Sequence, residues 1–329
     1  YKHTNVDDTI TVKKKADDFI FKLKNLGLLT SKQAKYLTCF NPRCPVFYGL
    51  PKVHKPGIPL RPICSQINGP TCRLNELVDK YLYTAEKNIP FLLQDTTAYL
   101  LLLEKYKQVQ PGTFLVTLDV TSLYTNIPHF EGADFVCDFY EETLPLWFEC
   151  AQVLPPVDKQ TLHCMILFIL QNCTFEFDNQ QYVQLYGTTM GAKFSVKFAN
   201  IYMHVWLSKF VGAYTGIKPD FIARLIDDCF FFWPYGVELL NDFIVYLNSC
   251  HSTIKFECTF SQDRVNFLDT TTYVDNDIIH TTVYTKPTDK KQYLYFTSSH
   301  PRHTAKAIPY SQALRYRKII EIGRASCRE

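Results

Sequence analysis

Length, composition and charge limit what this chain can be before any motif is considered. Its 329 residues suffice for roughly two or three structural units with a sizeable core. A hydrophobic content of 47% and a charged content of 20% exclude an intrinsically disordered chain. No apolar run reaches the roughly 18 residues of a membrane span. The twelve cysteines show no CxxC pair or metal-ligand spacing, and we interpret them as reduced thiols of an intracellular protein.

The first third of the chain combines helical periodicity with one segment that cannot be helical. Residues 12–40 place apolar side chains at helical spacing and predict one or two helices. The segment CPVFYGLPKVHKPGIPLRPICS, residues 44–65, contains prolines at 51, 56, 59 and 62, which forbid a helix and predict hairpin-like strands. Helical periodicity returns over 73–85 and 97–107.

From residue 112 onward, strand and helix patterns alternate. Residues 112–120, GTFLVTLDV, predict a strand with Asp119 near its end. The other expected elements are helices at 122–128, 158–171, 198–211 and 236–249, hairpins at 174–186 (about Asp178-Asn179) and 224–233, a loop at 187–197, and strands at 255–260, 265–269 and 278–284. The mixture favours the α+β class, with a mostly antiparallel sheet and helices on one face.

The stretch RLIDDCFFFW, residues 224–233, places two adjacent acids inside an apolar run. A buried carboxylate without a partner is costly or gives up its charge. Two interpretations of Asp227 and Asp228 remain open at this point. They form an ordinary surface turn of a hairpin, or they form a metal site at a hairpin tip, because carboxylates are natural ligands of Mg²⁺.

Asp119 is a third carboxylate in a similar setting, far earlier in the chain. If its strand pairs beside the hairpin at 224–233, three carboxylates converge, and two Mg²⁺ ions roughly 4 Å apart could bridge them. Because adjacent strand residues face opposite ways, we expect Asp227 to be the principal ligand and Asp228 the secondary one.

Two basic segments are candidates for binding phosphates. Lys52, Lys55 and Arg61 project from the proline-stiffened segment, where a fixed geometry suits a triphosphate. Between residues 286 and 318, eight Lys or Arg stand against one Asp, with aromatic residues interleaved, which suits a nucleic-acid backbone and its bases. For both segments, an ordinary solvated basic surface is the alternative.

Seven ordered segments together carry a resemblance to a known family. They are FYGLPKVHKPGIPLRPI, LVTLDVTSLYTNIP, YGTTMGAKFSVKFANIYM, RLIDDCFFF, VNFLDTTTY, YTKPTDKKQYLYF with SSHP, and IPYSQALRYRKI. In this order they resemble the reverse transcriptase of Penelope-like retroelements, which are relatives of telomerase. The resemblance implies a right-hand polymerase with fingers at 1–110, an antiparallel-sheet palm at 111–285, and the palm end with the start of a helical thumb at 286–320. Part of 158–197 would contribute to the fingers.

The resemblance also implies an activity and a role for individual residues. The activity is that of an RNA-directed DNA polymerase, a nucleotidyltransferase of a retrotransposon that extends a DNA primer on an RNA template. It uses dNTPs and two Mg²⁺ ions, for which Mn²⁺ can substitute. The implied residues are Asp119, Asp227 and Asp228 for catalysis and metal binding; Lys52, Lys55, Arg61, Tyr124 and Gly191 for the nucleotide; Lys255 as proton donor; and Lys286, Lys290, Lys291, Arg302 and Arg315 for nucleic acid.

Some of these roles have a plain structural alternative. Tyr124 matches the position whose ring excludes a 2′-hydroxyl, but a tyrosine there is equally a good core residue. Lys255 matches a lysine near the pyrophosphate, but a strand-edge lysine is the simpler interpretation. Gly187, Met190 and Gly191 match the loop before a helix that lies against the templating base pair, where small residues let nucleic acid approach closely.

The sequence departs from the family pattern after that loop. Ser195-Val196-Lys197 replaces an Ala-Pro-small triplet, and we expect Lys197 to add a charge near the template. Two other functions therefore stay open. One is a catalytically inactive retroelement remnant that only binds nucleic acid, and the other is an RNA-templated RNA polymerase, against which the bulky Tyr124 argues.

The ends of the chain carry three further expectations. The last nine residues, EIGRASCRE, resemble a translated sequencing-adapter read-through, so we exclude 321–329 from the fold. The chain opens on Tyr1 rather than Met, so we expect a preceding segment. The family carries a GIY-YIG endonuclease beyond the thumb, which we expect to follow in the whole protein. We expect an intracellular, nuclear location and no membrane partner.

Overall fold

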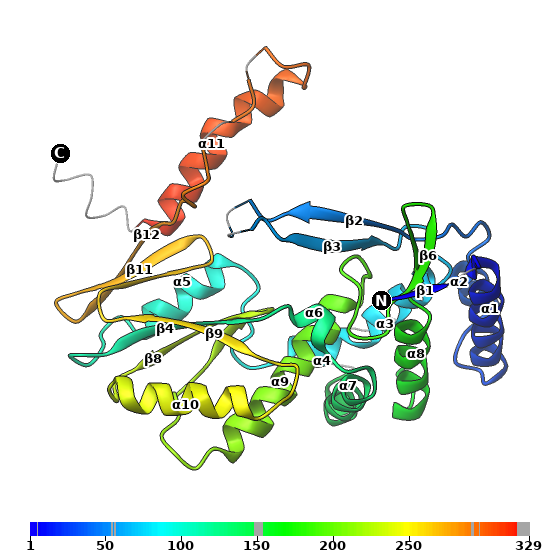
Figure 1. Cartoon of the computed structure of the whole chain (residues 1–329), viewed down its shortest axis with the longest axis horizontal. Coiled ribbons are helices and arrows are strands. Elements are labelled where there is room, and N and C mark those ends of the chain that lie inside the picture. Colours follow the sequence, from blue (N-terminus) through cyan, green and yellow to red (C-terminus); the bar gives the residue numbers. More distant parts are fainter. Residues whose placement is uncertain are drawn as a thin grey trace.

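The computed structural model describes residues 1–4, 6–53, 55, 57–147, 154–290, 293–295 and 297–320. Figure 1 shows three parts: a four-stranded sheet with its covering elements, a five-stranded sheet beside a group of helices, and one helix that projects away from both. The candidate residue Lys291 and the segment 321–329 lie outside the described residues.

The four-stranded sheet carries the aspartates singled out above. Its strand order is β7-β8-β4-β9, and all three strand pairs are antiparallel. The strands are β4 (Phe114–Val120), β7 (Ala223–Leu225), β8 (Asp228–Trp233) and β9 (Phe256–Ser261). The pairing of β7 with β8 confirms the hairpin predicted at 224–233, and β4 lies directly beside it as the metal-site interpretation requires.

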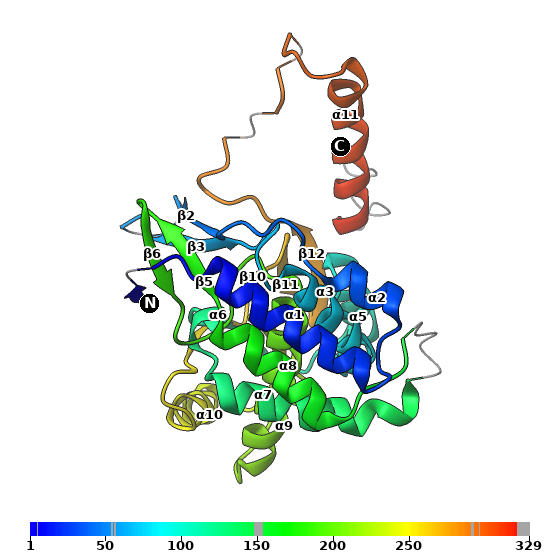
Figure 2. The ribbon, with the colours of Figure 1, turned by 90° about the vertical axis from the view of Figure 1, so that its right-hand side faces the viewer.

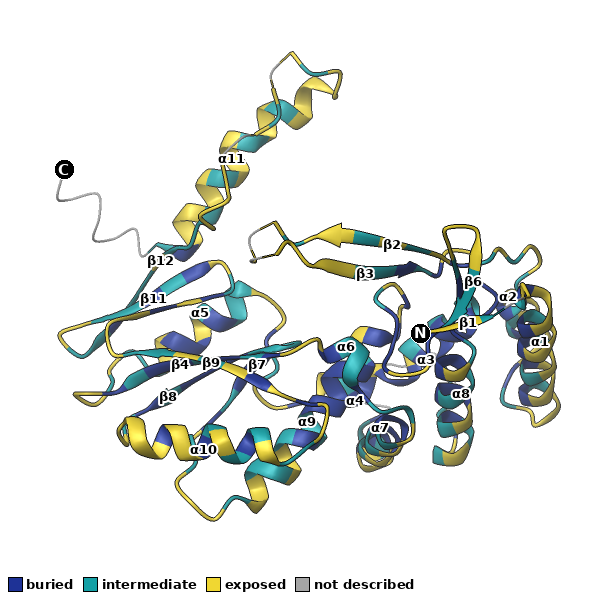
Figure 3. Ribbon diagram, viewed as in Figure 1, coloured by how far each residue is buried: buried dark blue, intermediate teal, exposed yellow. Residues whose placement is uncertain are grey.

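Both faces of this sheet are covered, which corrects the expectation of helices on one face. On one face, Val116 and Phe231 pack against helices α9 (Ser195–Ala213) and α10 (Val237–Ser249). On the opposite face, Leu115 and Phe230 belong to a second apolar cluster with α5 (Thr96–Lys105) and a smaller sheet. Figure 3 shows the four strands enclosed between these layers. The unbroken apolar run that follows Asp228 is the sequence signature of a strand buried on both sides.

The smaller sheet is a three-stranded antiparallel meander, β10-β11-β12. Its strands are β10 (Arg264–Phe267), β11 (Thr270–Asp275) and β12 (Ile278–Val283). The first and last agree with the predicted strands at 265–269 and 278–284, but β11 was not predicted. The turns on either side of β11 are only two residues long, with Leu268, Asn276 and Asp277 at positive φ, so three strands fit where two were expected.

The five-stranded sheet has the order β1-β6-β5-β2-β3. Its strands are β1 (Lys2–Thr4), β2 (Val46–Pro51), β3 (Leu60–Ser65), β5 (Thr174–Phe177) and β6 (Gln180–Val183). The β5–β6 hairpin turns at Asp178-Asn179 as predicted, with both residues at positive φ. The β2–β3 hairpin confirms the extended structure expected of the proline-rich segment, and it reaches out from this sheet toward the four-stranded sheet (Figure 1).

Helices α1, α2, α3 and α8 pack on one another beside the five-stranded sheet (Figure 2). Helix α1 packs on α8 through the stacked rings of Phe19 and Phe168, whose centroids lie 5.7 Å apart. The remaining helices are α1 (Thr9–Asn25), α2 (Ser31–Leu37), α3 (Cys72–Tyr81), α4 (Tyr83–Lys87), α6 (Leu123–Asn126), α7 (His129–Thr143), the 3₁₀ helix η1 (Leu144–Leu146) and α8 (Lys159–Gln171). The prediction of helices over 12–40, 73–85 and 158–171 is confirmed.

Helix α11 (Arg302–Ile319) projects away from the rest of the chain in both ribbon views (Figures 1 and 2). Within it only Ile319 is buried, so most of its surface faces solvent. Its C-terminal end is anchored on the meander, where the Thr281 hydroxyl donates a hydrogen bond to the Ile319 carbonyl. In the described part of the chain, no helix combines the length and the apolar character needed to cross a membrane.

Candidate functional site

A cavity of about 510 Å³ lies between the β2–β3 hairpin and the four-stranded sheet. It brings together segments that are far apart in the chain: the hairpin, the end of β4, helix α6, the loop before α9 and the β7–β8 turn. The predicted residues that line it are Lys52, Lys55, Arg61, Asp119, Tyr124, Gly191 and Asp227. Of the predicted catalytic and nucleotide-binding residues, Asp228 and Lys255 lie outside the described lining.

Strand pairing places acidic residues on three neighbouring strands at one level. Asp119 of β4 is the direct partner of Asp228 on one side and of Glu257 on the other. Asp227 stands in the β7–β8 turn, and its carbonyl accepts a hydrogen bond of 3.1 Å from the Val120 amide. Paired residues of antiparallel strands point to the same face of a sheet, so Asp119, Asp228 and Glu257 share a face.

Burial raises the pKa values of the three aspartates, and the charges of neighbouring acids add to the rise at Asp119 and Asp228. Burial and the charge of Asp227 raise the pKa of Asp119. Burial also raises the pKa of Asp227, against the partial compensation of its own backbone amide, Arg61 and Lys52. Burial and the charges of Asp227 and Asp119 raise the pKa of Asp228 to about 6. The charged forms of these carboxylates are therefore disfavoured in the protein alone, chiefly by burial.

The cations of the β2–β3 hairpin face this acidic cluster. The Lys55 ammonium lies 3.8 Å from Oδ2 of Asp119, and both side chains are partly exposed. Arg61 is paired with Leu50 in the hairpin register, and Lys52 follows immediately after β2, where its amide donates to the Pro59 carbonyl. The hairpin thus presents positive charge to the acids across the cavity, as a triphosphate site requires.

The donor set suits a hard divalent cation. Among the residues that the structure describes, no three or more His, Cys, Asp or Glu side chains are arranged to hold a metal ion by themselves. Mg²⁺ is usually held by only one or two carboxylates, the rest of its shell coming from substrate phosphates and water. Asp119 and Asp227 both line the cavity and both have raised pKa values, so they fit a cation bound in that way. The three-aspartate metal site stays a prediction.

Tyr124 is placed in the cavity by helix α6 and by the loop that crosses behind it. The Thr188 amide donates a hydrogen bond of 2.6 Å to the Tyr124 carbonyl. Burial and the charge of Asp227 raise the pKa of the Tyr124 phenol to about 12, so its hydroxyl stays neutral. Tyr124 combines both interpretations: its side chain packs against the main core, and the residue also lines the cavity.

The two glycines of this loop are required because protein backbone lies too close for a side chain at either position. Gly187 has φ of +71°, and a Cβ there would lie 2.2 Å from the Tyr124 carbonyl oxygen. Gly191 has φ of +138°, and a Cβ there would lie 2.2 Å from the Cys64 carbonyl oxygen on β3. The expectation that small residues admit nucleic acid is therefore incomplete, since both positions already exclude any larger residue.

Of the three residues that depart from the family pattern, Ser195 and Lys197 have structural roles. The Ser195 hydroxyl donates to the Thr189 carbonyl at 2.9 Å, and Val196 lines the cavity. Lys197 forms an ion pair of 2.7 Å with Asp79 of α3, and its side chain is only 16% exposed. Its charge is therefore balanced within the protein by Asp79, and its expected place near the template stays a prediction.

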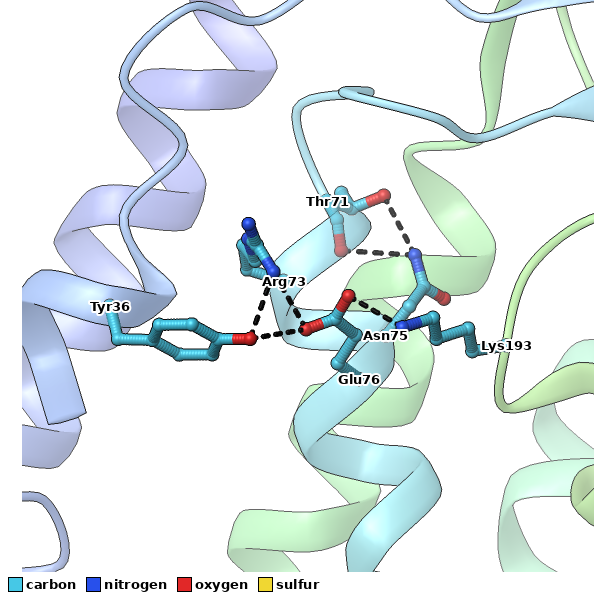
Figure 4. Close-up of polar contacts among 6 residues, drawn as sticks. All are labelled: Tyr36, Thr71, Arg73, Asn75, Glu76 and Lys193. Carbon is cyan, nitrogen blue, oxygen red and sulfur yellow. Dashed lines mark hydrogen bonds and ion pairs between the residues drawn. The ribbon is translucent and has the colours of Figure 1, made fainter.

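A second ionic cluster ties the same loop to α3, as Figure 4 shows. Glu76 accepts from Lys193 at 2.7 Å and from Arg73 at 3.0 Å. The Arg73 guanidinium also lies over the Tyr36 ring, 4.7 Å from its centroid. Together with the Lys197–Asp79 pair, this cluster fixes the loop that forms one wall of the cavity.

Lys255 and Glu257 differ from what the sequence suggested. The Lys255 ammonium donates to the carbonyls of Asn248 and His251 at the end of α10, which favours the structural interpretation. Its role as proton donor stays a prediction. Glu257 was not singled out, yet it lines the cavity and raises the pKa of Asp119. Only the pairing of β9 with β4 identifies it, and sequence alternation carries no such signal.

The predicted nucleic-acid-binding residues are spread from the end of the meander to α11. Lys286 is exposed, and its charge lowers the pKa of Asp228, so it lies toward the acidic cluster. Lys290 and Arg302 are exposed. Arg315 lies 3.7 Å from Asp269, in the β10–β11 turn. Their binding role stays a prediction.

Comparisons with known proteins identify the fold. No protein-family model and no curated protein sequence matches the chain. Among solved structures, it is similar to telomerase from Candida albicans in complex with a TWJ fragment of telomeric RNA. The TM-score is 0.57 at 10% identity, over 87% of this chain and 52% of that one.

Two further structures extend this likeness. Telomerase from Candida tropicalis, also with a TWJ fragment, matches with TM-score 0.51 at 14% identity, over 82% of this chain and 48% of that one. The BmCPV RNA-dependent RNA polymerase at its elongation state matches with TM-score 0.50 at 12% identity, over 85% of this chain and 25% of that one. The chain spans about half the length of the telomerase chains. It therefore has the polymerase-like fold of these proteins, of mixed helices and antiparallel sheets.

Proposed function

We propose that the chain is the polymerase part of a reverse transcriptase, an RNA-directed DNA polymerase of a Penelope-like retrotransposon that acts in the nucleus. The observation that carries the proposal is the cavity at which the hairpin cations, the acids of β4 and the β7–β8 turn, and Tyr124 all meet. A nucleotide polymerase needs three kinds of group close together: cations that bind a triphosphate, carboxylates that bind Mg²⁺, and a side chain that contacts the sugar.

The residues of the chain divide the work by charge. Lys52, Lys55 and Arg61 bind the phosphates of an incoming nucleotide. Asp119 and Asp227 hold the metal ions, with Asp228 as a weaker contributor. Bound Mg²⁺ supplies activation of the primer 3′-hydroxyl and charge stabilisation on the leaving pyrophosphate. In the free protein Lys55 lies beside Asp119, so it exchanges a carboxylate for a phosphate when the nucleotide enters.

Tyr124 supports a preference for deoxynucleotides. Thr188 holds its backbone, its side chain packs against the main core, and the residue lines the cavity, so these contacts restrict the ring. A rigid ring against the sugar leaves no room for a 2′-hydroxyl. The partners that follow are an RNA template, a DNA primer and dNTPs. The RNA-bound state of the similar telomerases supports an RNA template at the level of the fold.

An RNA-templated RNA polymerase is the second candidate, favoured by the likeness to the BmCPV polymerase. A primer-extension assay separates the two. On an RNA template with Mg²⁺, the proposal expects extension with dNTPs and far less with rNTPs. Extension with rNTPs alone would favour the second candidate. Tight binding of primer–template without any extension would favour an inactive remnant.

A further inference from the structure

The turn that carries Asp227 is strained. Ile226 has φ of +57°, in the left-handed region that β-branched residues avoid. Such a conformation persists only where surrounding contacts hold it, and it is typical of functional turns. The contacts that hold Ile226 therefore decide where the Asp227 carboxylate points.

A side-chain contact to Ile226 itself comes from Arg224, two residues earlier on β7. Its side chain is buried, with the residue only 3% exposed. The Nη1 atom donates 2.8 Å to the Ile226 carbonyl and 3.1 Å to Oδ1 of Asn200. The Nη2 atom donates 2.7 Å to the Asn200 carbonyl. One guanidinium thus joins the strained turn to helix α9.

The backbone of Arg224 is held as firmly as its side chain. Its amide donates to the Phe91 carbonyl at 3.0 Å, and its carbonyl accepts from the Leu93 amide at 2.8 Å. The contacts continue beyond Asn200, whose Nδ2 donates 2.8 Å to Glu86 of α4. Arg224 is therefore a fixed point from which the turn can be positioned.

Burying a cation is costly, so an arginine at this buried position indicates that its hydrogen bonds are needed. Burial alone would favour a neutral side chain at this position. The planar guanidinium can donate to acceptors on two separate segments in fixed directions, and a lysine ammonium cannot reproduce that geometry. The first turn of α9 also lines the cavity through Ser195 and Val196, so the helix that Arg224 holds forms part of the cavity wall.

We propose that Arg224 is the positioning residue of Asp227: by tying the Ile226 carbonyl to α9, it aims the Asp227 carboxylate at the cation site. This inference rests on the proposed polymerase function for its catalytic consequence. The structural consequence, a correctly placed metal ligand, can be tested without catalysis.

The test compares Arg224→Met, Arg224→Lys and the matched control Tyr202→Phe. Tyr202 is buried on α9, and its hydroxyl donates 2.7 Å to Glu131 of α7. The kcat and KM for dNTP are measured by primer extension. Mn²⁺ affinity is measured by electron paramagnetic resonance on the complex with RNA template, dideoxy-terminated primer and dNTP, and thermal stability by calorimetry.

Arg224→Met should lower kcat on the order of 100-fold, the effect of misplacing a reacting group by about 1 Å. It should weaken Mn²⁺ binding by roughly 10-fold or more, as loss of a group that orients a metal ligand does, with little change in KM. Arg224→Lys should recover part of both losses. Tyr202→Phe should lose stability while keeping kcat and Mn²⁺ affinity.

Several results would overturn the inference. One is an Arg224→Met protein whose kcat and Mn²⁺ affinity stay within about twofold of wild type. If that variant does not fold, Arg224→Lys decides: values equal to those of Tyr202→Phe contradict the proposal. A wild type that binds Mn²⁺ but extends no primer refutes the polymerase function alone, because Mn²⁺ affinity still tests Arg224. A wild type that does neither refutes both.

Discussion

Replacing Asp228 by Asn should make the metal-free protein more stable while lowering its activity. The pKa of Asp228 rises from 3.8 to about 6, because of burial and then the charges of Asp227 and Asp119. A rise of that size corresponds to about 3 kcal/mol of cost for the charged form. Solvent screening at a partly exposed position reduces this to on the order of 1–2 kcal/mol. Asparagine keeps the shape and removes the charge, so the variant escapes this cost.

The sign of the pH dependence follows from the direction of the shift. Because the folded pKa lies above the unfolded value, the native state binds more protons between pH 3.8 and about 6. The wild type therefore loses stability as the pH rises through this window, and the cost is complete above about pH 7. The gain from Asp228→Asn should be largest at pH 8 and about half as large at pH 5.

Calorimetry in EDTA at pH 5, 6, 7 and 8 measures this gain, with Asp242→Asn as control on the exposed face of α10. We expect a rise in Tm of roughly 2–4 °C at pH 8 for Asp228→Asn and no pH-dependent change for the control. Primer extension should fall in the same variant, the usual conflict between stability and an active site. A variant less stable than wild type at pH 8, or a gain independent of pH, would refute the raised pKa of Asp228.

Three further predictions concern the walls of the cavity. Tyr124→Val should raise rNTP incorporation relative to dNTP, measured as the ratio of kcat/KM values; an unchanged ratio would remove Tyr124 from sugar selection. Gly191→Ala should destabilise the protein by about 3 kcal/mol or more, measured by urea unfolding, because its Cβ would lie 2.2 Å from the Cys64 carbonyl. Wild-type stability in this variant would show that the loop is not packed on β3. A double-mutant cycle of Lys197→Met and Asp79→Asn should give a coupling of about 1 kcal/mol or more for this half-buried pair; a coupling near zero would leave Lys197 free.

Local patterns in the sequence predict much of the fold near the site. The proline-rich segment can only be extended, and the acid pair at 227–228 interrupts an apolar strand, so both hairpins were predictable. The ends of strands and helices follow from turn residues such as Asp178-Asn179. The predicted convergence of Asp119 with the β7–β8 turn needed only one assumption, that their strands are neighbours, and the register confirms it.

Features that depend on packing between distant segments were beyond such patterns. Glu257 enters the site only because β9 pairs with β4, and nothing in its own strand marks it. The contact of Arg224 with Asn200 joins residues 24 positions apart, and no pattern in the sequence predicts it. Strand β11 was not predicted because the turns on either side of it are only two residues long. The ion pair of Lys197 with Asp79 of α3 could not be predicted from either residue's own surroundings in the sequence. Side-chain partners of this kind are set by tertiary structure.

The central claim is that Asp227 holds the metal ions of nucleotidyl transfer. It is tested most directly by single-turnover extension of a DNA primer on an RNA template with dNTPs and Mg²⁺. Wild type, Asp227→Asn and the surface control Asp242→Asn are compared, and primer–template affinity is measured for each. The account predicts extension by wild type and control, and loss of extension in Asp227→Asn with primer–template affinity retained. Equal extension by Asp227→Asn and wild type would contradict it.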